Sequence, residues 1–232
     1  MFKTLISTCI LALIFPICIS AQDINQVVAQ VKKKIELVSD YEASGKMKTN
    51  VAFLKIPIAN VKMYFKRPNK LKLKSEKGVS FVPKGAMSLN MNNLFAENNY
   101  TIIDAGTEKI GNNTVRVARL LPNDDNSEIV LSTLYIDPIN LVIVKSKTTT
   151  RENGTYELEM NYKNYIKFGL PDKILFSFNT KDYKLPKGIT FDFDDGSSTK
   201  KASTDLKNKK GQAEITITSY IINKGIADVL FN

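Results

Sequence analysis

The apolar residues of this chain follow first a helical period and then a strand period. Between Ile24 and Val38 they recur at the i, i+3, i+4 and i+7 spacing, which places them on one face of an amphipathic helix. Asp23 can cap the start of this helix, and Ser39-Asp40 ends it. A helix with one apolar stripe must bury that stripe, so we expect it to pack against the rest of the fold.

After this helix the apolar period changes to two residues. Apolar residues alternate with polar ones at 61–66, at 70–74 and again at 156–163. Such strands bury one face and leave the other in water, which is typical of antiparallel sheets. Strands are also predicted at 43–54, 79–83, 100–110, 114–121, 127–136, 141–150, 173–180, 188–194 and 212–222, with turn residues between them. Short strands in series, joined by tight turns, predict a meander that curls toward a barrel.

One segment between Pro83 and Tyr100 returns to helical spacing. Met87, Met91, Leu94 and Phe95 fall on one face there, which predicts a short second helix against the sheet. Methionine-rich faces adapt to variable apolar ligands, but methionine also fills gaps in ordinary cores. Both interpretations of this helix stay open.

The first residues have the three parts of a secretory signal peptide. Lys3 precedes an apolar run from Leu5 to Ile19, and Ala21 offers a small residue for cleavage. The run is short for a membrane anchor and contains a proline. We therefore expect a signal peptide at 1–21, cleaved after Ala21, export to the periplasm, and a single domain at 22–232. Both cysteines precede the cleavage point, so the mature chain would lack thiols and disulfides.

The composition disfavours most enzyme classes. The sequence has no histidine, which removes the commonest general base and the commonest metal ligand. No other catalytic constellation or phosphate-binding loop is present, so we expect neither an enzyme nor a bound cofactor or metal. Without Lys3, the 33 basic residues become 32 against 23 acidic ones, a net charge of +9. A basic balance favours anionic partners, and export favours lipid head groups over nucleic acid; lysines that merely keep the protein soluble explain the charge equally well.

Three short strings resemble one known family. Residues 63–69 read Met-Tyr-Phe-Lys-Arg-Pro-Asn, at the end of a strand that follows the first helix. Residues 185–190 read Leu-Pro-Lys-Gly-Ile-Thr, and residues 168–174 read Phe-Gly-Leu-Pro-Asp-Lys-Ile. With the leader, the helix and the strands, these strings resemble the LolA-like periplasmic lipoprotein carriers. The chain lacks the tryptophan usual in that family, and its final strand resembles an addition at the C-terminus.

The resemblance implies a fold, a cargo and partners. The expected fold is mainly β with flanking helices (α+β), an antiparallel unclosed half-barrel covered by the N-terminal helix and a short lid helix. The family takes up acyl chains from an inner-membrane release complex and delivers them to an outer-membrane acceptor. By the motif match, Arg67 would hydrogen-bond to the lid and hold it shut; alternatively, Arg67 ends a strand and reaches solvent.

We therefore expect a monomeric periplasmic carrier of lipoprotein or lipid acyl chains, with no nucleic-acid partner. The alternative is a LolA-like envelope sensor or adaptor that acts through protein contacts. Most of the candidate lining residues could instead be plain core. They are Val61, Met63, Phe65, Leu71, Leu73, Met87, Met91, Phe95, Met160 and Phe176.

Overall fold

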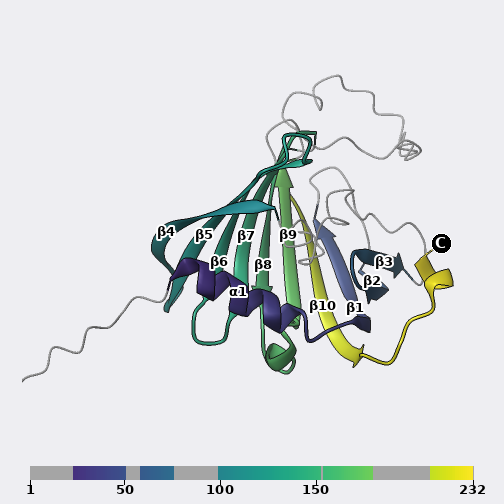
Figure 1. The fold of residues 1–232 in the computed structure, drawn as a ribbon. Coiled ribbons are helices and arrows are strands. Elements are labelled where there is room, and N and C mark those ends of the chain that lie inside the picture. Colours follow the sequence, from purple (N-terminus) through teal and green to yellow (C-terminus); the bar gives the residue numbers. More distant parts are fainter. Residues whose placement is uncertain (1–22, 51–57, 76–98, 153, 180–209, 232) are drawn as a thin grey trace, which may run out of the picture.

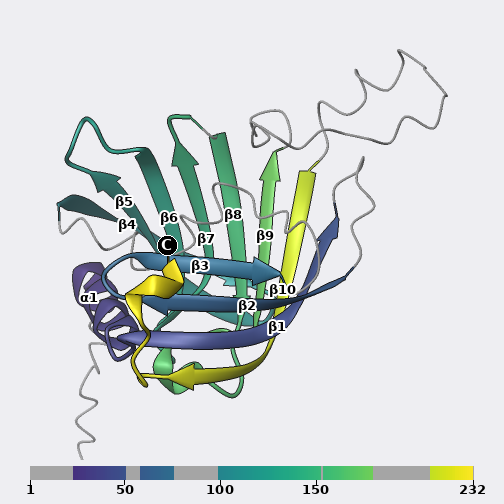
Figure 2. The same ribbon diagram turned by 90° about the vertical axis from the view of Figure 1, so that its right-hand side faces the viewer.

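The strands of this chain form one curved antiparallel sheet. A computed structural model describes residues 23–50, 58–75, 99–152, 154–179 and 210–231. Its 10-stranded sheet has the order β3-β2-β1-β10-β9-β8-β7-β6-β5-β4. The sheet wraps around without closing, and the helix α1 lies across the open side (Figures 1 and 2). The predicted unclosed half-barrel is confirmed, whereas the predicted leader and lid helix lie outside the described residues.

The helix α1 spans Ile24–Ile35 and packs as its period predicts. The Asp23 carboxylate accepts a hydrogen bond from the Asn25 backbone N–H at 3.1 Å and caps the first turn. Lys32, Lys33 and Lys34 lie in the last turn, where positive charge interacts favourably with the helix dipole. The predicted end at Val38 is too late, because Val38 packs with Phe65 and Leu170 after the helix has ended. Across the described ranges, no helix combines the length and apolar character required to cross a bilayer.

Most strand bounds agree with the alternation in the sequence. The predicted strands 79–83 and 188–194 and the methionine-rich helix lie outside the described residues. Within the described ranges, the short 3-10 turns η2 at Ile166–Phe168 and η4 at Asp228–Phe231 accompany the sheet. The strands are β1 Asp40–Asn50, β2 Ala59–Lys66, β3 Lys70–Ser75, β4 Tyr100–Ile110, β5 Asn113–Pro122, β6 Ile129–Asp137, β7 Val142–Thr150, β8 Gly154–Asn161, β9 Lys173–Asn179 and β10 Lys210–Ile222.

The topology differs from a simple meander in one respect. Strand β10 pairs with β1, so β3 and β4, which follow one another among the described strands, form the opposite edges of the sheet. The last strand is therefore central, and its interpretation as a C-terminal addition is wrong. Local alternation says which residues share a face but not which distant strand becomes the neighbour.

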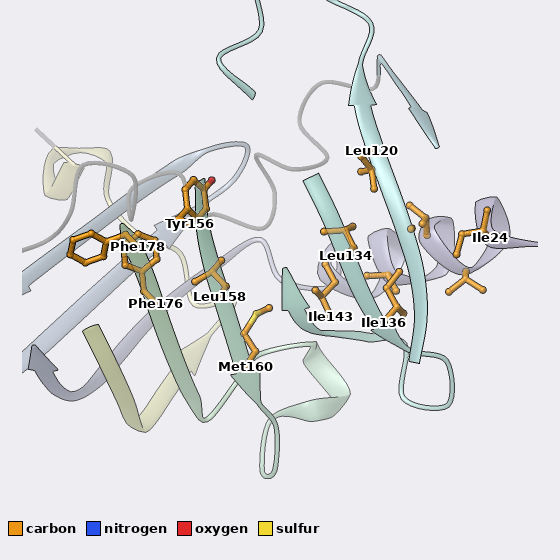
Figure 3. Close-up of a cluster of buried hydrophobic side chains, with 14 of the residues drawn as sticks. Ile24, Leu120, Leu134, Ile136, Ile143, Tyr156, Leu158, Met160, Phe176 and Phe178 are labelled. Atoms are coloured by element: carbon orange, nitrogen blue, oxygen red, sulfur yellow. The ribbon is translucent and has the colours of Figure 1, made fainter. Parts of the chain in front are cut away.

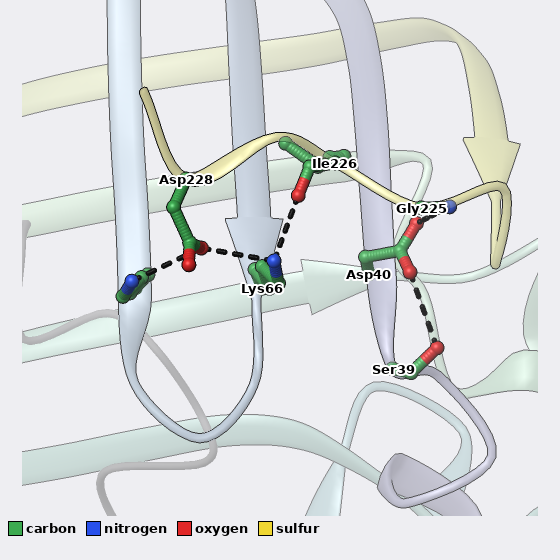
Figure 4. Close-up of polar contacts among 7 residues, drawn as sticks. Ser39, Asp40, Lys66, Gly225, Ile226 and Asp228 are labelled. Carbon is green, nitrogen blue, oxygen red and sulfur yellow. Dashed lines mark hydrogen bonds and ion pairs between the residues drawn. The ribbon is translucent and has the colours of Figure 1, made fainter. Parts of the chain in front are cut away.

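A polar junction fixes the C-terminal segment to the start of β1. The side-chain oxygen of Asn223 accepts from the Ser39 backbone N–H at 2.8 Å, and its amide donates to the Leu37 carbonyl at 2.8 Å. The buried Asp40 carboxylate accepts from the backbone N–H of Gly225 at 3.0 Å (Figure 4). These bonds satisfy the backbone where α1 turns into β1.

Candidate functional site

The predicted lining residues that the structure describes share one face of the sheet. Met63 lies opposite Leu73 and Phe65 opposite Leu71 in the β2–β3 register. On the other side of β10, Leu158 lies opposite Phe176. We call the sheet face that carries these residues, and that α1 covers, the concave face. Of the predicted set, Met87, Met91 and Phe95 lie outside the described residues.

Two apolar clusters make the concave face continuous. The first joins α1 to β5–β10 and contains Leu158, Met160 and Phe176 (Figure 3). The second joins β1, β2 and β10 and contains Val61 and Met63. Ile174 on β9 packs against both clusters, so they form one apolar surface. Phe65 belongs to a third, adjoining cluster with Val38 and Leu170. Leu71 and Leu73 are only partly buried on the edge strand β3, at the margin of this surface.

A group of aromatic residues extends this surface beyond the predicted set. The Tyr41 ring lies 5.2 Å from that of Phe65 and 5.3 Å from that of Tyr220, measured between centroids. Tyr165 packs edge-on against Tyr220 at 4.8 Å. The Tyr220 hydroxyl donates to the Pro171 carbonyl at 2.8 Å, and burial raises the pKa of Tyr41 and Tyr220. Sequence reasoning missed these residues because they come from separate elements; their apolar bodies and polar tips were the available signal.

A patch of hydroxyls interrupts the apolar surface on β6, β7 and β8. The hydroxyls of Ser132 and Thr148 lie 3.1 Å apart within hydrogen-bond reach. Burial raises the pKa of the neighbouring Tyr156 to about 12, so its hydroxyl stays neutral. The Ser146 hydroxyl is buried and has no hydrogen-bond partner in the part of the chain that the structure describes. The concave face thus offers a small neutral polar area within a hydrocarbon-like surface.

Arg67 connects the β2–β3 hairpin to the end of α1. Its guanidinium donates to the Glu36 carbonyl at 3.1 Å and lies 3.4 Å from the Glu36 carboxylate. Its backbone N–H donates to the Ser39 carbonyl at 2.9 Å. The predicted contact of Arg67 with a lid helix involves residues outside the described ranges and stays a prediction.

The described residues also line a polar cavity of about 590 Å³. It lies between the β4–β5 hairpin, the β6–β7 turn and the end of β8. Of the predicted lining residues that the structure describes, only Met160 contributes to this cavity. Nearby, the Lys34 ammonium donates to the Asn140 carbonyl at 2.6 Å. Burial would raise the pKa of Asp137, but hydrogen bonds from Asn140 and Ile139 and the charge of Lys34 lower it. Charged groups in the lining, including Glu108, Asp137 and Lys145, make this cavity unsuitable for hydrocarbon.

The curved sheet and the helix on its open side have counterparts among solved structures. The chain has the LolA-like fold. Over 89% of its length it matches 95% of a Vibrio parahaemolyticus domain named for outer membrane lipoprotein sorting, at 13% identity and a TM-score of 0.56. Over 88% it matches 97% of a LolA superfamily protein from Nitrosomonas europaea, at 10% identity and a TM-score of 0.52. A DUF1329 family protein from Desulfovibrio piger matches over 89% of this chain and 95% of that one, at 10% identity and a TM-score of 0.55. No protein-family model and no curated protein matches the sequence.

Proposed function

We propose that the chain is an exported carrier that binds the acyl chains of lipoproteins or lipids against its concave face. The observation that carries the proposal is the continuity of that face. Its apolar side chains run from Leu71 and Leu73 on β3 to Met160 on β8, on a sheet whose two edge strands do not pair with each other. An unclosed sheet leaves a route by which a chain can enter and leave.

An apolar surface without reactive groups is sufficient to bind an acyl chain, because the binding free energy comes from burying its methylene groups. Each buried methylene gains about 0.8 kcal/mol, so a carrier that covers part of one acyl chain recovers a large share of its solvation cost. The neutral hydroxyls near Thr148 can donate a hydrogen bond to a carbonyl of the cargo, and they place no charge beside the hydrocarbon. The proposal assigns no catalytic step to any residue.

The proposed setting is the bacterial envelope. The leader predicted at 1–21 would direct the chain to the periplasm, and a soluble carrier there needs donors and acceptors of lipidated cargo in the two membranes. Support for this setting comes from the leader pattern and from the lipoprotein-sorting name of one structural neighbour.

The test is uptake of a fluorescent fatty-acyl probe by the purified mature chain, with a matched pair of variants. Leu73→Arg puts a charge at the margin of the concave face, and we expect it to weaken probe binding about tenfold or more. Leu175→Arg makes the same change on the outer face, between Glu159 and Glu214, and should bind the probe like the unaltered chain. Circular dichroism checks that both variants fold. Equal binding by the two variants, or no uptake by the unaltered chain, would contradict the proposal.

A further inference from the structure

The outer face of the sheet carries a concentration of lysines on β1, β2 and β3. Strand β3 alternates Leu71 and Leu73, on the concave face, with lysines that face outward. The facing positions of β2 and β1 continue this pattern, since Lys46 and Lys48 flank the buried Met47. We call this surface the lysine face; its β2 and β3 members are Lys62, Lys66, Lys70, Lys72 and Lys74.

The register places like charges directly against each other. Lys62 lies opposite Lys74, and Lys66 lies opposite Lys70. Like charges at facing positions destabilise a sheet, because their side chains lie within a few ångströms of each other. Lysines that only keep a protein soluble do not need this arrangement.

Lysines elsewhere on the outer face are arranged differently. On β7 and β8, Lys145 lies 3.5 Å from the carboxylate of Glu157. On β9 and β10, Lys173 lies 2.8 Å from the carboxylate of Glu214. On the lysine face, Glu42 pairs with Lys62, and Asp228 pairs with Lys66 and Lys70. Strands β1, β2 and β3 contain seven lysines and two carboxylates, Asp40 and Glu42, so positive charge exceeds negative charge there.

Apolar side chains adjoin the lysine face at the C-terminal turn η4. Asp228 forms ion pairs with Lys66 at 2.9 Å and with Lys70 at 3.0 Å, and this holds η4 beside the end of β2 and the start of β3 (Figure 4). The next residue, Val229, is 70% exposed. The Phe231 ring lies 6.0 Å from the Lys70 ammonium. Basic residues with exposed apolar ones at their margin are typical of surfaces that rest on a membrane interface.

We propose that the lysine face is the surface by which this protein docks on anionic lipid bilayers. The described part of this face uses lysine and no arginine, and a lysine ammonium is a compact point charge on a flexible stem rather than a bidentate ligand of one phosphate. Mobile charges of this kind suit a field of lipid head groups better than a single acidic partner site. Because the concave face lies on the other side of the same strands, docking leaves the acyl-binding surface uncovered.

The test is co-sedimentation of the mature chain with phosphatidylcholine vesicles, with and without phosphatidylglycerol. We expect binding to the anionic vesicles alone, and its loss when salt rises from about 0.1 M to about 1 M, because the screening length falls from about 10 Å to about 3 Å. Each lysine near an anionic surface contributes about fivefold in affinity. The exposed triple variant Lys46→Gln, Lys48→Gln, Lys74→Gln should therefore bind about a hundredfold more weakly.

The matched control removes the same charge elsewhere. Lys109→Gln, Lys163→Gln, Lys167→Gln changes three exposed lysines outside the lysine face and should keep vesicle affinity within about threefold, since these charges lie away from the docked surface. Both triple variants should take up the acyl probe normally, which separates this proposal from the proposed function. An equal loss of vesicle affinity in the two triple variants would show that binding depends only on net charge, and would overturn the proposal. Absence of vesicle binding, with crosslinks from Lys46 or Lys74 to an acidic envelope protein, would overturn it in favour of a protein partner.

Discussion

Arg67 in the β2–β3 hairpin donates a hydrogen bond of 3.1 Å to the backbone carbonyl of Glu36, the residue that ends α1. A carbonyl at a helix end has no partner within the helix, so the guanidinium satisfies an otherwise unpaired acceptor. The contact also fixes the edge hairpin of the sheet to the helix on its open side. The position of the helix over the concave face therefore depends in part on this pair.

We predict that Arg67→Ala lowers the free energy of unfolding by about 1 kcal/mol. A hydrogen bond from a charged donor contributes about 1.5–3 kcal/mol when buried, and this one is partly exposed, which reduces its value. Glu36→Gln keeps the carbonyl and removes only the carboxylate, so it should cost less than about 0.5 kcal/mol. Urea unfolding of both variants measures the difference. A larger loss for Glu36→Gln than for Arg67→Ala would show that the ion pair, not the helix-end bond, stabilises the junction.

The core beneath α1 offers a second prediction. Leu134 on β6 is fully buried in the first apolar cluster, and Leu134→Ala should destabilise the fold by about 2–5 kcal/mol because it leaves a cavity. Leu121→Ala provides the control, since Leu121 is 37% exposed and should cost less than about 1 kcal/mol. Thermal unfolding followed by circular dichroism compares them. Similar costs at the two positions would contradict the close packing of Leu134 in the first apolar cluster.

Gly45 on β1 allows a close approach of two backbones. A Cβ atom at this position would lie 2.5 Å from the Thr216 carbonyl oxygen of β10, beside an irregularity in the pairing at Ser44 and Gly45. Gly45→Ala must therefore move one strand, and we expect a loss of about 1–3 kcal/mol. Ser44→Ala, on the outer face next to it, should have little effect on urea unfolding. An unchanged stability of Gly45→Ala would contradict the observed β1–β10 contact.

The C-terminal turn should respond to pH through Asp228. Hydrogen bonds and charge from Lys66 and Lys70 lower the pKa of Asp228 below its ordinary value of 3.8. A lowered pKa means that this contact is fully present above the ordinary value and is lost as pH falls through the lowered one. We expect the protection of the Leu230 amide, which bonds to the Ala227 carbonyl, against hydrogen exchange to fall in that range, measured relative to an unstructured amide at the same pH. Asp228→Asn should show the same low protection at neutral pH, and unchanged protection in that variant would contradict the role of the carboxylate.

The sequence predicted the features of the fold that depend on the local spacing of apolar residues. Val27, Val28 and Val31 indicated the buried side of α1, and the strand predicted at 100–110 has the observed bounds of β4. The sharing of one face by Met63, Leu73 and Phe176 also follows from alternation once the strands are paired.

What the sequence did not predict depends on contacts between distant segments. The pairing of β10 with β1 joins residues more than 160 positions apart, and no local pattern encodes it. In the sequence, Asn223 looks like an ordinary turn residue. In the structure, its side chain forms hydrogen bonds with the backbone of Ser39 and Leu37. Val38 falls at helical spacing and is therefore predicted to lie in the helix, but it packs with Phe65 of β2, a contact that the local pattern does not show.

The most direct measurement of the central claim is photocrosslinking of a fatty acid with a diazirine on its chain, followed by peptide mass spectrometry of the mature protein. If acyl chains bind the concave face, labels will fall on residues of that face, including Met63, Leu73 and Met160, and excess unlabelled fatty acid will remove them. Labels confined to the outer face or to the polar cavity beside Asp137, or no labels that the competitor removes, would contradict it.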